Sequence, residues 1–254
     1  MTASPLDRVA VVLVEPQNPA NVGAAARAMK NMGLSRLILV APPTYDPHRA
    51  RWMAPGCDDV IARTEIVNTL DEALAGVHYA YATTARHRAL NQPVLEHRQV
   101  AAEIVNSDRR FAILFGREDT GLSSEHVQRC AAVVRIPTPE HASLNLGQAV
   151  LLVAHALFEA ARDHGLHATG RKVGGQHGFR ETTDLDRAEP LADLPQIERA
   201  AIAASELLGA AGYAAPTEKR LVVLRGALQR AGLTERELSA VRGMIAALAK
   251  PRQA

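Results

Sequence analysis

Five short, continuous runs of β-branched and aliphatic residues recur along the first two thirds of the chain. Continuous rather than alternating apolar runs are typical of strands that are buried on both faces of a sheet. Segments with helical spacing separate them, and strands that alternate with helices imply right-handed crossovers and a mainly parallel sheet. The predicted fold class is therefore α/β, with strands at 8–14, 36–42, 77–84, 111–116 and 131–137 and helices at 22–32, 69–75, 98–105, 124–130 and 145–161.

The character of the sequence changes after residue 161. Residues 162–195 are polar and rich in glycine with almost no apolar periodicity, which predicts a flexible linker. Three segments with helical spacing follow, so residues 196–254 are expected to form a small helical C-terminal module. Thr217 and Thr234 are expected N-caps, and Thr234 with Glu237 fits a capping box. Residues 1–161 then form one α/β domain.

The composition is that of an ordinary globular protein, with 47% apolar and 22% charged residues in 254. A formal net charge of +2 is small, so any binding of nucleic acid must depend on local clusters of lysine and arginine. The apolar run near the N-terminus is too short to span a membrane and lacks the layout of a signal peptide. We therefore expect no membrane partner.

The cysteines and histidines do not indicate a metal site. Cys57 and Cys130 lack metal-ligand spacing and are too few for a disulfide framework, which fits a reducing cytoplasm. His164, His167 and His177 lie among glycines and arginines without a cysteine partner, so solvated side chains are expected rather than zinc ligands. The prediction is a cytoplasmic protein without a bound metal.

The first expected helix carries one arginine among alanines. Gly23, Arg27 and Lys30 share one face of this helix, and Gly23 lies one turn before Arg27. A residue without a side chain at that position would let an anion approach the helix start, where free N–H groups favour negative charge. Spacing alone leaves two alternatives open: Arg27 contacts an anion, or it is solvated while the alanines pack closely.

Two loops follow expected strands at the edge where open α/β sheets bind ligands. The first, "LFGREDTGLSSE" at 114–125, is neither a dinucleotide-binding nor a phosphate-binding glycine loop. The second lies in "IPTPEHASLNLGQAV" at 136–150, where Ser143 or Asn145 could simply cap the long helix that follows. These loops make a pocket plausible but do not identify its ligand.

Three segments taken together resemble the signature motifs of the SpoU family of RNA ribose 2′-O-methyltransferases. They are "NPANVGAAARAMKNMG" (first motif, 18–33), "FGREDTGLSSE" (second motif, 115–125) and "IPTPEHASLNLGQAV" (third motif, 136–150). Within the family, the chain is most similar to the TrmJ branch, which methylates ribose 32 in the tRNA anticodon loop. The resemblance, which covers residues 8–161, implies a deep C-terminal trefoil knot, a homodimer, S-adenosylmethionine as methyl donor and tRNA as substrate.

The resemblance also implies roles for individual residues. Arg27 matches the catalytic arginine, and the same site would include Asn21, Glu118, Ser143 and Asn145. Asp119 departs from the family pattern, because a basic or neutral residue is frequent at this position. The residues expected to contact S-adenosylmethionine are Thr83, Thr84, Ala85, Gly116, Ile136, Ser143 and Leu144.

Basic residues near the motifs and in the C-terminal part are the expected RNA contacts, although each alone could equally belong to an ordinary charged surface. Two alternatives to tRNA methylation at nucleotide 32 remain open. One is methylation of ribosomal RNA or of another tRNA position, and the other is a non-catalytic RNA-binding protein with a residual cofactor pocket. The expected RNA contacts are Arg27, Lys30, Arg117, Arg171, Lys172, Lys219, Arg220 and Arg225.

Overall fold

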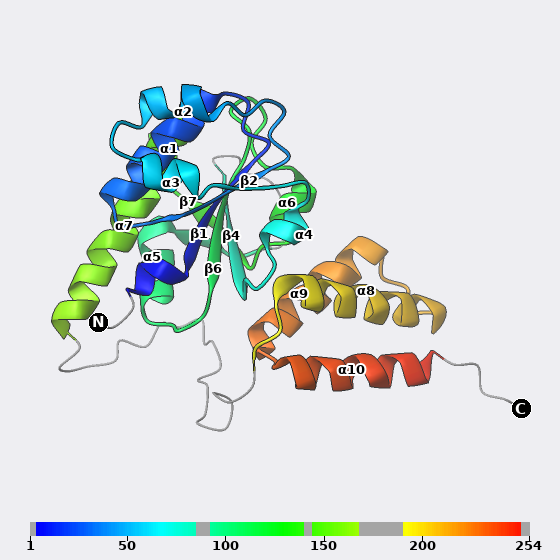
Figure 1. The fold of residues 1–254 in the computed structure, drawn as a ribbon. Helices are drawn as coiled ribbons and strands as arrows, with labels where there is room; N and C mark the ends of the chain where they lie inside the picture. The colour runs from blue at the N-terminus through cyan, green and yellow to red at the C-terminus, as the bar shows by residue number, and fades with distance from the viewer. Residues whose placement is uncertain (1–3, 85–91, 140–143, 168–189, 250–254) are drawn as a thin grey trace, which may run out of the picture. The chain divides into compact units, whose positions relative to one another are not determined.

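The computed structural model describes residues 4–84, 92–139, 144–167 and 190–249 (Figure 1). The chain divides into two compact units. The first lies within Met1–Ala73 and Tyr79–Gly175, and the second comprises Leu74–His78 with Gln176–Ala254. Ala85, Ser143, Arg171 and Lys172, all predicted site residues, lie outside the described residues.

A parallel sheet of seven strands forms the centre of the first unit, in the order β3-β2-β1-β6-β4-β7-β5. All six strand pairings are parallel, which confirms the predicted α/β class. The central strands β1 and β6 are buried along their whole length, as their continuous apolar runs predict. The strands are β1 (Val9–Val14), β2 (Arg36–Val40), β3 (Glu65–Val67), β4 (Tyr79–Thr83), β5 (Val94–Glu96), β6 (Phe111–Phe115) and β7 (Ala132–Arg135).

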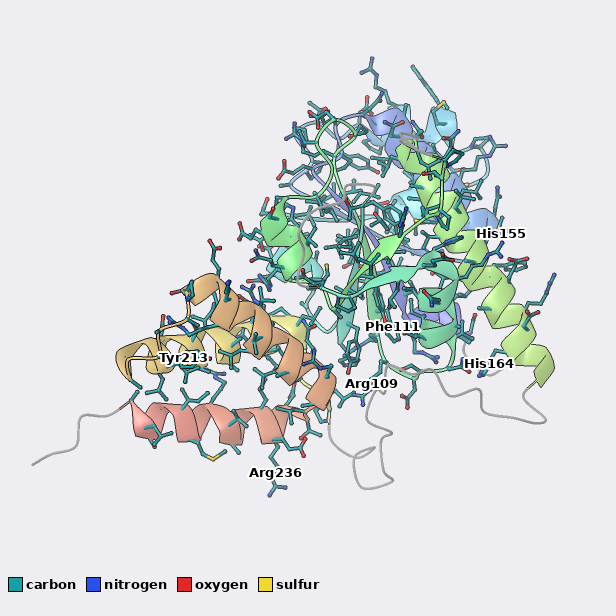
Figure 2. The ribbon with its side chains drawn as sticks, turned by 180° about the vertical axis from the view of Figure 1, so that it is seen from behind. Arg109, Phe111, His155, His164, Tyr213 and Arg236 are labelled. Carbon is teal, nitrogen blue, oxygen red and sulfur yellow. The ribbon has the colours of Figure 1, made fainter. Side chains whose placement is uncertain are left out.

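Aromatic rings reinforce the pairing of β4 with β6. Phe111 at the start of β6 (Figure 2) stacks against Tyr79 and Tyr81, with ring centroids 5.9 and 6.1 Å apart. Burial and the neighbouring Glu103 carboxylate raise the pKa of Tyr81 well above its ordinary value, so its hydroxyl stays protonated and donates to Glu103 over 3.0 Å. The centre of the sheet is thus closely packed.

Helices cover the sheet, and α7 packs against both α1 and α5. The long helix α7 continues to His167, so the linker predicted from residue 162 does not begin there. Its last residues are mostly polar, and the helix continues without the apolar periodicity on which the prediction depended. The helices of this unit are α1 (Pro19–Asn31), α2 (Pro47–Met53), α3 (Asp58–Ala62), α4 (Leu70–Ala73), α5 (His97–Val105), α6 (Ser124–Gln128) and α7 (Leu146–His167), and a 3₁₀ turn (Pro5–Arg8) precedes β1.

The second unit contains the helices α8 (Leu194–Ala210), α9 (Thr217–Ala231) and α10 (Glu235–Leu248). The predicted capping box of α10 is confirmed, because Thr234 Oγ1 accepts from the Glu237 amide and the Glu237 carboxylate accepts from the Thr234 amide. Thr217 is not an N-cap, since α9 begins at that residue and Pro216 occupies the cap position. Within the described part of the chain, no helix is both long and apolar enough to cross a membrane.

Candidate active site

Polar residues gather where β1 ends and α1 begins. Glu15 directly follows β1 and has a positive φ of 49°, a conformation that costs a non-glycine residue about 1–2 kcal/mol. Its backbone N–H donates to the Val40 carbonyl over 2.8 Å, and its side chain reaches toward the loop that follows β6. The strained turn therefore directs a carboxylate across the carboxyl ends of neighbouring strands.

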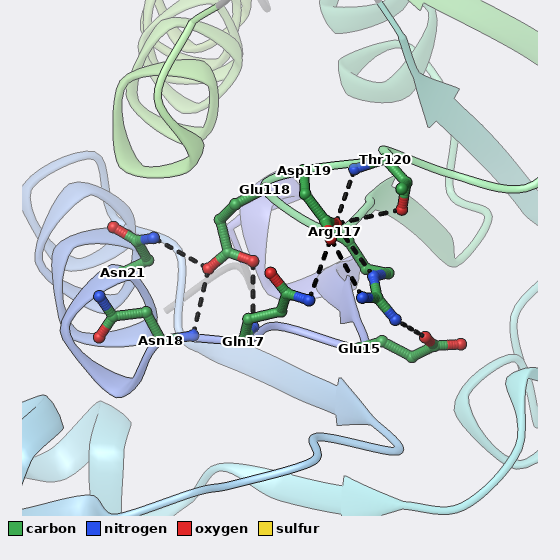
Figure 3. A network of polar contacts seen from close by, with 8 residues as sticks. All are labelled: Glu15, Gln17, Asn18, Asn21, Arg117, Glu118, Asp119 and Thr120. Atoms are coloured by element: carbon green, nitrogen blue, oxygen red, sulfur yellow. Dashed lines mark hydrogen bonds and ion pairs between the residues drawn. The ribbon is translucent and has the colours of Figure 1, made fainter.

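Arg117 fastens the second motif to this turn (Figure 3). Its Nη1 donates to Glu15 Oε2 over 2.9 Å, while its Nε and Nη2 donate to the two Asp119 oxygens over 3.1 and 3.2 Å. Gln17 Nε2 also donates to Asp119, over 3.2 Å. The Arg117 guanidinium holds the pKa of Asp119 well below its usual range. Asp119, the residue that departs from the family pattern, therefore pairs with Arg117, which also binds Glu15. We call Glu15, Arg117 and Asp119 the clamp. Arg117 is engaged by two carboxylates rather than free for RNA.

Glu118 lies against the start of α1 in the same network (Figure 3). Its carboxylate accepts hydrogen bonds from the Gln17 and Asn18 amides over 3.0 and 3.3 Å and from Asn21 Nδ2 over 2.9 Å. Burial by itself would raise the pKa of Glu118, but the hydrogen bonds from Asn21 and the backbone outweigh it, and the pKa lies below its ordinary value. An ionised carboxylate thus holds Asn21 in place.

Asn145 brings the third motif to the same point. Its Nδ2 donates to Asn21 Oδ1 over 3.4 Å, and its Oδ1 accepts from the Gly147 amide over 2.9 Å. The side chain therefore caps the first turn of α7 and contacts Asn21 at once, so the two roles considered for it from sequence are compatible. Glu118, Asn21 and Asn145 link all three motifs, and we call them the motif cluster.

Arg27 lies apart from the motif cluster. The predicted close packing of the alanines is confirmed, because Ala25 and Ala26 are fully buried, and Arg27 itself is exposed. Among the residues that the structure describes, Arg27 forms no hydrogen bond or ion pair. It points to a different side of α1 from Asn21, as their spacing along the helix requires.

Gly23 does not leave room for a ligand, contrary to the prediction. A Cβ atom at this position would lie 2.1 Å from the Ala50 carbonyl oxygen and 3.0 Å from the Met53 Cβ. The missing side chain therefore admits α2, which packs across α1 at this point. On the same face, Lys30 forms an ion pair with Asp59, so its ammonium group is already partnered.

Three of the predicted cofactor contacts, Thr83, Gly116 and Ile136, lie at the carboxyl ends of neighbouring strands. β4 pairs with both β6 and β7, which places Thr83, Gly116 and Ile136 along one edge of the sheet. Thr83 Oγ1 donates to the Leu114 carbonyl over 2.8 Å. Gly116 is needed by its own loop, because a Cβ there would lie 2.2 Å from the backbone of Gly121. Thr84, Ile136 and Leu144 are partly buried, so the edge offers backbone groups and apolar side chains to an adenosine-sized ligand.

A cavity of about 280 Å³ opens beside the clamp, lined in part by Glu15, Arg117 and His126. The described residues contain no group of three or more His, Cys, Asp or Glu side chains arranged to hold a metal ion.

Sequence reasoning missed Glu15, Gln17 and Asn18, all of which contact the second motif. Their position directly after a buried strand was the signal that could have identified them.

Two of the predicted RNA contacts in the second unit have internal roles. Arg225 is 9% exposed and forms a bidentate ion pair with Glu198 over 2.5 and 2.6 Å. Arg220 donates to the Tyr213 and Ala215 carbonyls over 3.2 and 2.5 Å, closing the α8–α9 connection. Because their donors are used inside the fold, Arg220 and Arg225 are not free to contact RNA, contrary to the prediction, whereas Lys219 is exposed.

Comparison with known proteins supports the motif assignment. The model of the SpoU rRNA Methylase family matches residues 8–155. The chain is 35% identical over 246 residues to the tRNA (cytidine/uridine/adenosine-2′-O-)-methyltransferase TrmJ of Pseudomonas aeruginosa (strain UCBPP-PA14), covering 94% of this chain and 93% of that protein.

Solved structures agree with this result. TrmJ from Z. mobilis ZM4 superimposes with a TM-score of 0.75 and 32% identity, covering 95% of this chain and 99% of that one. A probable methyltransferase from Bordetella pertussis Tohama I matches with a TM-score of 0.58 and 37% identity, covering 62% of this chain and 98% of that one. With motifs, family model, full-length relatives and fold in agreement, the chain belongs to the SpoU methylase family.

Proposed function

We propose that this protein transfers a methyl group from S-adenosylmethionine to a ribose 2′-hydroxyl of tRNA, at cytidine or uridine 32 of the anticodon loop. The observation that carries the proposal is the motif cluster, in which Asn21, Glu118 and Asn145 connect the three family motifs through hydrogen bonds. The relatives named TrmJ, which match over nearly the whole chain, favour tRNA as the substrate.

The cofactor would be held at the carboxyl ends of β4, β6 and β7. Backbone groups with partly exposed apolar side chains fit an adenosine, which binds through its flat ring and a few hydrogen bonds. When bound, S-adenosylmethionine supplies the methyl group as a sulfonium. The residues we assign to it are Thr83, Thr84, Ala85, Gly116, Ile136, Ser143 and Leu144.

Arg27 acts as an electrostatic anchor in this proposal. A guanidinium has a pKa above about 12 and does not serve readily as a base. Its charge instead binds the phosphate next to the target ribose and stabilises the alkoxide that develops on the 2′-oxygen, while the proton passes to water or a phosphate oxygen. Aligning the reacting atoms can contribute about 7–11 kcal/mol. Asn21, Glu118, Ser143 and Asn145 complete the catalytic set.

We further propose that the protein is a cytoplasmic homodimer with the trefoil knot of its family. Arg27 is exposed and lies on a different side of α1 from Asn21, which favours a site completed by a second subunit. Helix α7 carries an exposed stripe in which Leu151, Leu152 and Phe158 are 39%, 39% and 40% exposed, and His155 (Figure 2) lies among them. Burial of this stripe against a second copy would remove apolar surface from water.

RNA contacts in the proposal come from the exposed cations that the fold does not use. Arg27 and Lys219 are exposed in the structure, and Arg171 and Lys172 remain predictions. Lys30 and Arg117 are already paired with carboxylates and would have to exchange those partners for phosphate. In this proposal residues 1–161 carry out catalysis and the helices α8–α10 bind tRNA, with a linker from the end of α7 between them.

Methylation of ribosomal RNA is the second candidate, because the matching family model is described by that substrate. Incubating the protein with tritiated S-adenosylmethionine and either total tRNA or ribosomal RNA separates the two. We expect label in tRNA, and label confined to ribosomal RNA would contradict the proposal. Calorimetry with S-adenosylmethionine adds a check, since a folded protein that does not bind it would be a non-catalytic RNA-binding protein instead.

A further inference from the structure

Helix α2 presents an exposed tryptophan that the fold does not use. Trp52 is 79% exposed, and it is the single tryptophan in the sequence. The packing of α2 is provided by its other side, where Ala50 is fully buried and contacts α1 at Gly23. At this exposure the Trp52 ring contributes little to the packing of the domain and is accessible to an external partner.

Two further exposed residues flank Trp52 on the same side of α2. His48 and Arg49 precede it by four and three positions, the spacings that place helical side chains next to one another. Arg51 forms an ion pair with Asp58 over 3.4 Å, whereas the Arg49 side chain forms no ion pair or hydrogen bond within the described residues. We call His48, Arg49 and Trp52 the α2 patch, and its charge complements a polyanion.

Helix α2, which carries the patch, packs on α1 close to the proposed catalytic arginine. Helix α2 crosses α1 at Gly23, one turn before Arg27, and the Lys30–Asp59 pair binds the next turn of α1 to α3. These two contacts bracket Arg27 along the same face of α1. Figure 1 shows α2 at the end of the sheet where β1 ends and α1 begins. An RNA chain that reaches Arg27 therefore passes close to α2.

We infer that the α2 patch binds an unpaired RNA base next to the target nucleotide, with Trp52 stacking on the base and Arg49 contacting a neighbouring phosphate. This inference rests on the proposed function and adds a recognition site to it. Proteins read single-stranded RNA mainly by stacking aromatic side chains on splayed bases and by placing cations along the backbone. The unpaired bases of an anticodon loop meet that requirement, whereas double-stranded RNA does not expose a base face.

The single tryptophan makes a direct test possible. Fluorescence quenching by acrylamide is measured for the 254-residue protein alone and with an unmodified tRNA transcript. We expect Trp52 to be freely accessible in the protein alone and protected when the transcript binds. Emission that is already shielded in the free protein would show that a second copy or another part of the chain covers Trp52, which would overturn the inference.

Kinetics with variants complete the test. Trp52→Ala is expected to raise KM for the transcript by about 5- to 150-fold, the range for losing one stacked base, with little change in kcat. Trp52→Phe keeps a ring and should recover most of the affinity. Ile66→Ala removes another exposed apolar side chain, at 55% exposure on β3, and serves as the matched control.

The outcomes separate the two proposals. If the wild-type protein methylates tRNA and Trp52→Ala has an unchanged KM, the inference is wrong and the proposed function stands. If the wild-type protein methylates no RNA, the proposed function fails and this inference fails with it. An increase in KM that Trp52→Phe does not correct would show a structural effect rather than stacking, and would also contradict the inference.

Discussion

Glu118 has the most demanding environment of the residues in the motif cluster. Its carboxylate accepts from two backbone amides and from Asn21, and no neutral side chain of the same shape could accept all three hydrogen bonds equally well. The site therefore depends on Glu118 being ionised. A glutamine would turn its own N–H₂ toward donors on one side.

We expect Glu118→Gln to lower kcat more than it lowers stability. Because the pKa of Glu118 is depressed in the folded protein, the carboxylate stabilises the fold above its unfolded pKa near 4.3, and this contribution is lost as the pH falls through the folded value. The cost at pH 7 should be only about 0.5–1 kcal/mol, since the exposed carboxylate is screened by water. Urea unfolding of wild type and Glu118→Gln at pH 7 and pH 4 measures this difference in the free energy of unfolding. A variant that loses as much stability on acidification as wild type would contradict the prediction.

The role of a residue could be predicted where it belongs to a motif with a chemical function. It could not be predicted where a residue distant in the sequence packs against it. Asn21 and Glu118 were predicted as partners in one site and are hydrogen-bonded. Gly23 was assigned to a ligand because a missing side chain shows only that something approaches closely. Helix α2 fills that space, and the sequence pattern did not predict α2.

At the level of elements, α1 is held by two close contacts that permit only small side chains. Gly23 admits α2, and Gly147 admits α1 to α7, where a Cβ would lie 2.8 Å from the Ala24 Cβ. These contacts position the start of α1, which carries Asn21. Packing between helices, rather than the loops alone, therefore sets the geometry of the motif cluster.

Gly23→Ala is expected to destabilise the α/β domain by about 1–3 kcal/mol, because the added methyl group would overlap the Ala50 carbonyl. Gly243→Ala is the matched control, since a Cβ at that helical position meets nothing within 4 Å. It should stabilise its helix by about 0.5–1 kcal/mol. Denaturant unfolding followed by circular dichroism compares them, and equal effects of the two substitutions would argue against the α1–α2 contact.

The Glu198–Arg225 pair joins α8 to α9, and breaking it should be costly. Glu198→Gln leaves the Arg225 charge buried without a counter-charge, so a loss of about 3–5 kcal/mol is expected in thermal unfolding of the helical unit. Replacing both residues, as in Glu198→Leu with Arg225→Met, should be close to neutral. The double variant should also bind tRNA normally, and weakened binding by this folded protein would restore Arg225 as an RNA contact.

The sequence predicted the five inner strands because each is a continuous apolar run. It did not predict β3 and β5, which lie at the two edges of the sheet and have only three residues each. Their exposed positions interrupt the apolar pattern, and pairing with a neighbour defines them as strands. Helices α2 and α3 were missed for a similar reason, since short helices with few buried positions show little periodicity.

At the scale of the whole molecule, we propose that two copies of the chain together form the active enzyme. We expect Leu151→Asp, in the exposed stripe of α7, to convert a dimer to monomers in light scattering and to abolish methyl transfer. Val223→Asp places the same charge on α9 and should leave the dimer intact. A Leu151→Asp variant that remains a dimer would show that α7 is not the interface.

The family, and with it the chemistry, was predictable because three long motifs occur in order, whereas the trefoil knot and the dimer depend on arrangements that no local pattern encodes. Both remain predictions. In the proposed function, the cofactor bound at the edge formed by β4, β6 and β7 and the exposed Arg27 act on the same ribose. The position of the transferred methyl group therefore tests the whole proposal.

The most direct measurement is to map that methyl group on a tRNA transcript after reaction with labelled S-adenosylmethionine, using the resistance of a 2′-O-methylated linkage to alkaline cleavage. Wild-type protein should protect the linkage after nucleotide 32, and Arg27→Ala should bind the cofactor but leave that linkage cleavable. Protection at another nucleotide, or label on a base that leaves every linkage cleavable, would contradict the proposed function.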